Sequence, residues 1–120
     1  MNFRLSTEQL GDDIYVIAFV GEADPYSAPE LKRELVETIE GGARHIVVDL
    51  TGTTFIDSTT LGVLIGALKR LRPRGGDVSI VCADPNIRKI FDITLLDRIF
   101  AMDESLAEAR ERLALTPAGP

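Results

Sequence analysis

The chain has 120 residues, 45% of them apolar and 27% charged, which predicts one globular domain able to bury its own core. A formal net charge of −6 argues against nucleic acid as the main partner, because proteins that bind nucleic acid present a basic surface. The single cysteine excludes an internal disulfide framework, and the absence of a signal core or a membrane-length apolar run predicts a cytoplasmic protein that does not bind membranes.

The first twenty residues have the pattern of a β-hairpin. Residues 3–10 alternate loosely between apolar and polar, and residues 14–20 are rich in β-branched and aromatic side chains. The intervening Gly11-Asp12-Asp13 is typical of a turn. We therefore expect an antiparallel pair of strands at the N-terminal edge of a sheet, followed by a loop over residues 21–25.

A helix is predicted after that loop. Ser27 is a candidate N-cap, with Glu30 three residues later at the spacing of a capping box and Pro29 early in the helix. Gly41-Gly42 ends the helix. Its core-facing positions recur at helical spacing and are Leu31, Leu35 and Ile39.

The remaining elements alternate between strands and helices. The nearly continuous apolar run over residues 44–50 predicts a central strand. Asp57 or Ser58 caps the next helix, which ends near Pro73 and whose Arg70, Arg72 and Arg74 complement its C-terminal dipole. Beyond it we expect a strand over residues 77–83, a short helix over 85–91 capped by Asp84, a strand over 100–102 and a helix capped by Asp103 and ending at Leu113. Cys82 lies in an apolar run and is predicted to be a buried, inert thiol.

This alternation predicts an α/β fold. We expect a single domain over residues 1–115, with about four helices packed on a small mixed sheet of about four to five strands, and a flexible tail over residues 116–120. The sheet should be mostly parallel, with the N-terminal hairpin supplying the antiparallel strand.

Two loops at the carboxyl ends of strands are the candidates for function, since functional residues of open α/β sheets gather there. They cover residues 21–27 and 51–60, and they share one rim if their strands are neighbours. The second loop carries the hydroxyl cluster Ser58-Thr59-Thr60 at the start of a helix, where backbone N–H groups and the helix dipole favour a phosphate. That phosphate could belong to a ligand or be attached to a side chain.

Enzymatic use of Ser58 is not supported by the residues around it. A nucleophilic serine needs a nearby base, and His45, the only histidine, lies at the start of a strand and hence at the opposite end of the sheet. Neither the G-x-S-x-G elbow nor the spacing of a P-loop occurs. We predict no catalytic residue.

Two features leave alternatives open. Asp24, Asp49 and Asp57 could together hold a hard cation, but Asp57 is equally explained as a helix cap and Asp24 as a turn residue, so we predict no metal and no cofactor. Gly62 and Gly66 either let their helix approach the sheet or leave an exposed strip beside Ser58 for a partner.

The chain resembles the STAS domain family, and within it the bacterial anti-sigma factor antagonists. The resemblance covers nearly the whole chain and rests on an ordered set of segments: residues 21–24 (GEAD), 45–50 (HIVVDL), 55–62 (FIDSTTLG), 75–76 (GG) and 90–96 (IFDITLL).

The resemblance implies a partner-switching regulator of transcription in stress response or sporulation, and not an enzyme. Such a protein binds an anti-sigma factor that is also a serine kinase, and so frees a sigma factor. Phosphorylation of Ser58, with Thr59 as second choice, switches it off, and a serine phosphatase acts on the phosphorylated form. The partner-binding residues implied are Asp24, Asp57, Ser58, Thr59, Thr60 and Gly62.

One residue departs from the family pattern, and one other function remains open. The family usually has glycine at the position of Thr60, whose β-branched side chain adds bulk where the kinase approaches. The alternative function is a STAS accessory subunit of a lipid-transport ATPase complex or of a signalling scaffold.

Overall fold

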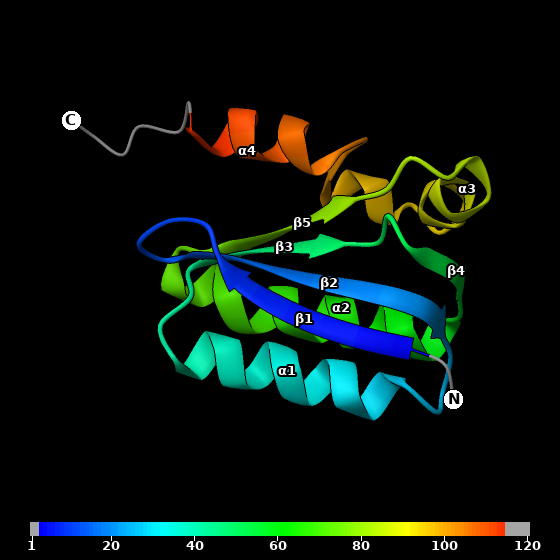
Figure 1. The fold of residues 1–120 in the computed structure, drawn as a ribbon, viewed down its shortest axis with the longest axis horizontal. Helices are drawn as coiled ribbons and strands as arrows, with labels where there is room; N and C mark the ends of the chain where they lie inside the picture. Colours follow the sequence, from blue (N-terminus) through cyan, green and yellow to red (C-terminus); the bar gives the residue numbers. More distant parts are fainter. Residues whose placement is uncertain (1–2, 115–120) are drawn as a thin grey trace.

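The computed structural model describes residues 3–114 and has a six-stranded mixed sheet with four α-helices (Figure 1). The α/β class, the antiparallel N-terminal hairpin and the number of α-helices are as predicted. In chain order the elements are β1 (Phe3–Gln9), β2 (Ile14–Ala23), α1 (Ala28–Glu40), β3 (His45–Asp49), β4 (Thr53–Ile56), α2 (Ser58–Leu71), the 3₁₀ turn η1 (Arg72–Arg74), β5 (Asp77–Val81), α3 (Pro85–Ile93), the 3₁₀ turn η2 (Leu96–Arg98), β6 (Ala101–Asp103) and α4 (Leu106–Ala114). The predicted tail lies outside the described residues.

The strands follow the order β1-β2-β3-β5-β6, and only β1 runs antiparallel to its neighbour. The sixth strand, β4, pairs in parallel with the far end of β2. Helices connect most of the parallel strands because a parallel pair needs a crossover. Figure 1 shows α1 and α2 together along one face of the sheet and α4 on the opposite side.

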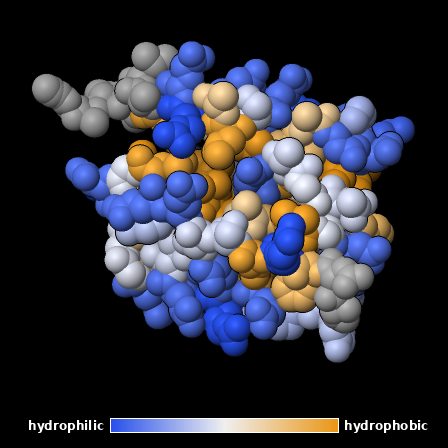
Figure 2. All heavy atoms as spheres, viewed as in Figure 1, coloured by the Kyte–Doolittle hydropathy of each residue, from blue (hydrophilic) through white to orange (hydrophobic). Residues whose placement is uncertain are grey.

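The central strands β3 and β5 are buried on both faces because helices cover both sides of the sheet. Within β3, Ile46 and Val48 belong to the larger core with α1 and α2, whereas Val47 points to the other face and packs with Ala109 of α4. In Figure 2 apolar residues are visible between α4 and the strands, where the smaller cluster includes the partly buried Leu10 and Leu106.

The sheet has six strands where about four to five were predicted, because β4 forms within a segment that has the sequence of a loop. The predicted loop after residue 20 is also wrong in part: β2 continues through Gly21, which has φ +117°, and through an irregularity in register to Ala23. This extension gives the four-residue β4 a partner. A strand so short has no periodicity of its own, so the pairing depends on the length of β2.

Two predicted helix caps also differ in the structure. Ser27 precedes α1 but makes no side-chain capping bond there. Asp103 is the last residue of β6, and the start of α4 is instead held by Ser105, whose Oγ accepts from the Glu108 N–H at 3.1 Å. A nearby serine with an acidic residue three positions on is the stronger capping arrangement.

Candidate functional site

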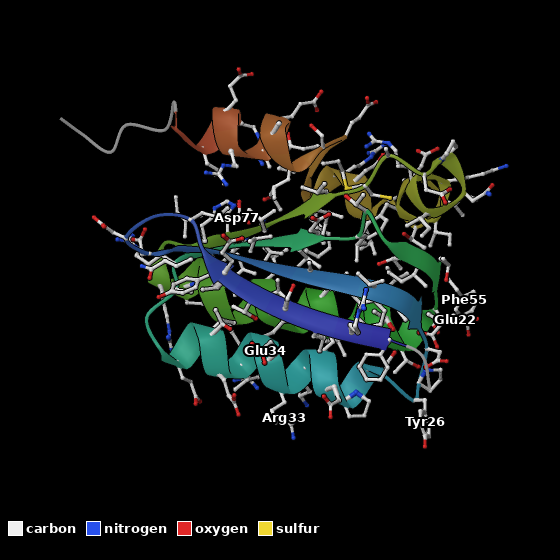
Figure 3. All side chains as sticks on the ribbon, in the orientation of Figure 1. Glu22, Tyr26, Arg33, Glu34, Phe55 and Asp77 are labelled. Carbon is white, nitrogen blue, oxygen red and sulfur yellow. The ribbon has the colours of Figure 1, made fainter. Side chains whose placement is uncertain are left out.

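The two loops predicted at one rim do lie together. Ala23 at the end of β2 pairs with Ile56 at the end of β4, and the backbone N–H of Asp57 donates to the Ala23 carbonyl at 3.1 Å. Asp24 and Asp57 each follow directly after these paired residues. Figure 3 shows Glu22 and Phe55 side by side at this end of the sheet, and Tyr26 below them near the start of α1.

Asp57 is the N-cap of α2, and it fixes the start of that helix. Its backbone is extended, with φ −120°, and its Oδ1 accepts from the Thr60 N–H at 3.0 Å. Ser58 is therefore the first residue of α2, at the positive end of the helix dipole. Of the two alternatives for the cap, the structure has Asp57.

Ser58 and Thr59 present their side chains to solvent. Both are exposed, and within residues 3–114 no hydrogen bond engages either hydroxyl group. A phosphoryl group on Ser58 would lie beside the free N–H groups of the first turn of α2, which stabilise an anion. The position thus allows access from outside and accommodates a negative charge.

Asp24 organises the neighbouring loop. Its Oδ1 accepts from the N–H groups of Tyr26 and Ser27, both at 3.0 Å. The Ser27 hydroxyl is buried and donates to the Glu22 carbonyl at 2.9 Å. These bonds fix the turn that leads from β2 into α1, whose N-cap residue is Ser27.

Two aromatic residues on the same rim were not among the predicted site residues. The exposed fraction is 71% for Tyr26 and 49% for Phe55, unusually high for large apolar side chains. Aromatic side chains are enriched at the centres of protein interfaces. The sequence could have indicated both residues, because each of the two candidate loops contains one aromatic side chain among mainly polar residues.

Thr60 differs from its neighbours because it is fully buried. Its bulk therefore lies inside the domain and is not presented at the surface beside Ser58 and Thr59. Its Oγ1 is the buried side-chain oxygen that lacks a hydrogen-bond partner among the described residues. Threonine in place of the family's usual glycine therefore affects the packing and hydrogen bonding of the first turn of α2, not the exposed surface.

Gly62 and Gly66 do not serve to bring α2 close to the sheet. A Cβ built on either glycine would have no heavy atom within 4 Å apart from the helix itself. Of the two explanations for these glycines, the structure favours the open strip. That strip continues from Ser58 along α2.

The other side chains considered for chemistry lie apart from one another within the described residues. His45 begins β3, as predicted, and its Nε2 lies 3.1 Å from the buried Ser79 Oγ at the amino end of the sheet. Burial lowers the pKa of His45. Among residues 3–114 no three His, Cys, Asp or Glu side chains gather as metal ligands, and Asp49 instead accepts from the Thr51 N–H at 3.0 Å.

Two further predictions concern residues away from the rim. Cys82 is buried, and burial raises the pKa of its thiol. In the basic cluster after α2, Arg72 donates to the Ile99 carbonyl at 2.8 Å and lies 3.6 Å from an Asp77 oxygen. Among the helices of the described residues, none has the length and hydropathy needed to cross a membrane.

Comparisons with other proteins place the chain in a family. The STAS domain family model matches residues 6–109. The anti-sigma-B factor antagonist of Staphylococcus epidermidis is 34% identical over 104 residues, which cover 87% of this chain and 95% of that protein.

Solved structures have the same fold. An anti-sigma factor antagonist from Mycobacterium paratuberculosis superposes with a TM-score of 0.86 at 23% identity, over 94% of this chain and 95% of that one. The Bacillus cell fate determinant SpoIIAA in its phosphorylated form gives 0.75 at 22% identity, over 92% and 99%. The sequence, the family model and the fold agree, and the chain belongs to the STAS domain family.

Proposed function

We propose that this protein is an anti-sigma factor antagonist. In its unmodified form it binds an anti-sigma factor that is a serine kinase, and so frees a sigma factor; phosphorylation of Ser58 switches it off. The observation that carries the proposal is the exposed Ser58 hydroxyl at the first position of α2, directly after the Asp57 cap. The relatives named anti-sigma-B factor antagonist support it, at 34% identity over most of the chain.

The partner surface is built from the two loops of the rim. Asp24 and Asp57 are half-buried and held by bonds to backbone N–H groups, so their positions are set before the partner arrives. Tyr26 and Phe55 offer exposed aromatic area. A preorganised polar site with aromatic anchors is what a specific protein interface requires.

Phosphorylation would act on the interface more than on the domain. A phosphoserine adds about −1.5 to −2 charges and three acceptor oxygens, and the N-terminus of α2 stabilises that charge without rearrangement. In the complex the dianion must be desolvated beside the Asp57 carboxylate. A loss of about 4 kcal/mol from this repulsion weakens binding roughly a thousandfold.

The domain supplies no catalytic group of its own in this scheme. The kinase provides the phosphoryl group, and a separate serine phosphatase restores the unmodified form, in the cytoplasm. SpoIIAA, which shares the fold, has been obtained in a phosphorylated form. Thr59 is the second candidate acceptor, since it is also exposed and lies one residue further along α2.

The test uses purified anti-sigma factor kinases from the organism that encodes this chain. One of them, with ATP, should add a single phosphate that mass spectrometry assigns to Ser58. Ser58→Ala should bind that kinase and stay unmodified, whereas Ser58→Glu should bind at least about tenfold more weakly in calorimetry. Ser6→Glu on the exposed side of β1 is the matched control for added charge and should bind normally.

Two results would overturn the proposal. The first is the absence of phosphate at both Ser58 and Thr59 with a kinase that binds the chain. The second is full binding by Ser58→Glu.

A further inference from the structure

A groove of about 320 Å³ runs between α1 and α2, on the face of the sheet away from α4. Its walls are mainly apolar and include Val36 on α1 and Val63 and Ala67 on α2. Thr59 lines one end, next to Ser58, so the groove continues the rim described above.

The groove is open because α2 carries glycine at two of the positions that line it. Gly62 and Gly66 each weaken the helix relative to alanine. Neither is needed for packing, since a Cβ on either would meet no neighbouring atom within 4 Å. The fold alone gives no reason for glycine here, whereas close approach of another molecule to the bare backbone of α2 does.

Both charged residues that line the groove are positively charged. Lys32 and Arg70 line it, and no carboxylate does, although the chain carries a net charge of −6. Among the described residues neither cation forms an ion pair.

Two of the acidic residues of α1 have partners outside the groove. Glu30 pairs with Arg33 on the outer side of the helix, and Glu34 accepts a hydrogen bond from Thr7 of β1. Figure 3 shows Arg33 directed away from the sheet and Glu34 toward β1. The groove therefore complements an anionic occupant in a protein that is otherwise acidic.

The positions of the two cations indicate the shape of that occupant. Lys32 lies in the first half of α1 and Arg70 at the end of α2. The groove positions of α2 extend over twelve residues, from Thr59 to Arg70, or about 16 Å along the helix. This length matches about three turns of a second helix, with an acidic residue near each end.

We propose that the groove binds an amphipathic helix of a partner protein. Apolar side chains of that helix, spaced three or four residues apart, fill the space above Gly62 and Gly66, and its terminal carboxylates pair with Lys32 and Arg70. The inference rests on the proposed function only in taking the partner to be a protein. It does not depend on phosphorylation of Ser58.

The first experiment uses synthetic peptides, so it needs no identified partner. One fourteen-residue helical peptide has leucines at three-four spacing and glutamates near both ends, and the second has lysines in place of the glutamates. In NMR titrations of the full chain the acidic peptide should shift the amide signals of Gly62, Gly66 and Ala67. The lysine peptide should bind about tenfold more weakly or worse.

Matched variants locate the contact. Gly66→Leu fills the groove, while Lys69→Leu adds the same side chain to an exposed position of α2 outside it. Arg70→Glu reverses a charge inside the groove, and Arg74→Glu reverses one beyond it. Each groove variant should lose about tenfold or more in peptide affinity, and each control should keep it.

The inference is overturned if neither peptide shifts the groove signals at millimolar concentration, or if Gly66→Leu binds as well as Lys69→Leu. It is also overturned if dodecanoate shifts these signals while the acidic peptide does not, because the groove is then a site for an acyl chain. The proposed function fails separately, through the Ser58 variants and the kinase.

Discussion

At the scale of single residues, two buried threonines differ in whether the side-chain hydroxyl group is hydrogen-bonded. The Thr53 hydroxyl donates to the Phe19 carbonyl at 2.8 Å, whereas Thr60 Oγ1 is buried without a partner. Thr60→Val should therefore raise the free energy of unfolding by about 1 kcal/mol, because an unpaired buried hydroxyl is replaced by a methyl group of similar shape. Thr53→Val, the matched control, should lower it by about 1 to 2 kcal/mol.

Urea unfolding followed by circular dichroism measures both changes. A Thr60→Val variant less stable than the parent would mean that the hydroxyl is satisfied in solution. In that case the tolerance of threonine at this position needs a different explanation.

His45 gives the domain a pH dependence of known sign. Burial lowers its pKa below the ordinary value of 6.5, against the opposing effect of Asp77, while Arg112 acts in the same direction as burial. Asp13 and Asp103 also oppose the shift. The folded protein thus keeps His45 neutral at a pH where the unfolded chain protonates it, and the free energy of unfolding falls as pH falls below about 6.5.

The comparison is between the parent and His45→Gln, which keeps a neutral polar group near Ser79. The stability advantage of the parent over this variant should shrink as the pH falls from 7.5 to 5.5 in urea unfolding. An advantage that is the same at every pH would contradict the shift.

At the scale of elements, the glycines of α2 and of the turn before β5 have different roles. Gly66→Ala should stabilise the domain by about 0.5 to 1 kcal/mol, because the added methyl group improves helix propensity and has open space around it. Gly76→Ala should destabilise it strongly, because its Cβ would collide with the Arg44 carbonyl group. Thermal unfolding of both variants checks the contrast.

The outcome that would contradict this prediction is a loss of stability in Gly66→Ala. It would show that α2 already packs tightly at the groove in solution. Since alanine still leaves most of the groove open, the same variant should bind the acidic peptide better than Gly66→Leu does.

At the scale of the whole molecule, an ion pair attaches the last helix to the sheet. Arg112 of α4 donates to Asp103 of β6 through Nε and Nη2, the latter at 2.7 Å, and the Asp103 side chain is only 10% exposed. Arg112→Ala leaves that carboxylate without its bidentate partner and should cost about 1 to 3 kcal/mol. Hydrogen exchange of the α4 amides should accelerate more than that of α1 or α2.

The matched control is Arg33→Ala, which removes an exposed pair with Glu30 on the outer side of α1. Such pairs contribute less than about 1 kcal/mol. If the α4 amides exchange at the same rate in both variants, the helix is held by the packing of Ala109 and its leucine neighbours. The ion pair then contributes little to its attachment.

The features that the sequence predicted well depend on neighbours in the chain. The hairpin, the helix after Asp57 and the Asp84 cap follow from spacing and capping chemistry within a few residues, and Asp84 does accept from the Asn86 N–H at 2.8 Å. The meeting of Asp24 and Asp57 at one rim also followed, because the carboxyl ends of parallel strands share an edge.

The features that the sequence did not predict depend on pairs far apart in the chain. The four residues of β4 form a strand only because β2 runs on to Ala23, and Asp103 is held by Arg112 instead of capping α4. The burial of Thr60 and the exposure of Phe55 depend on which side of the rim each residue faces. Local propensity carries no information on these contacts.

The amino-acid sequence by itself determined the α/β class, the order of most elements and a hydroxyl cluster at a helix start, since each rests on local periodicity or capping chemistry. The choice of Ser58 as the phosphate acceptor came from the resemblance to the family. Only the tertiary structure decided that Thr60 is internal and that Gly62 and Gly66 line a groove whose charged residues are Lys32 and Arg70. A groove is a property of two helices and the distance between them. That distance is set by how α1 and α2 pack on the shared sheet, which no segment of the chain specifies alone.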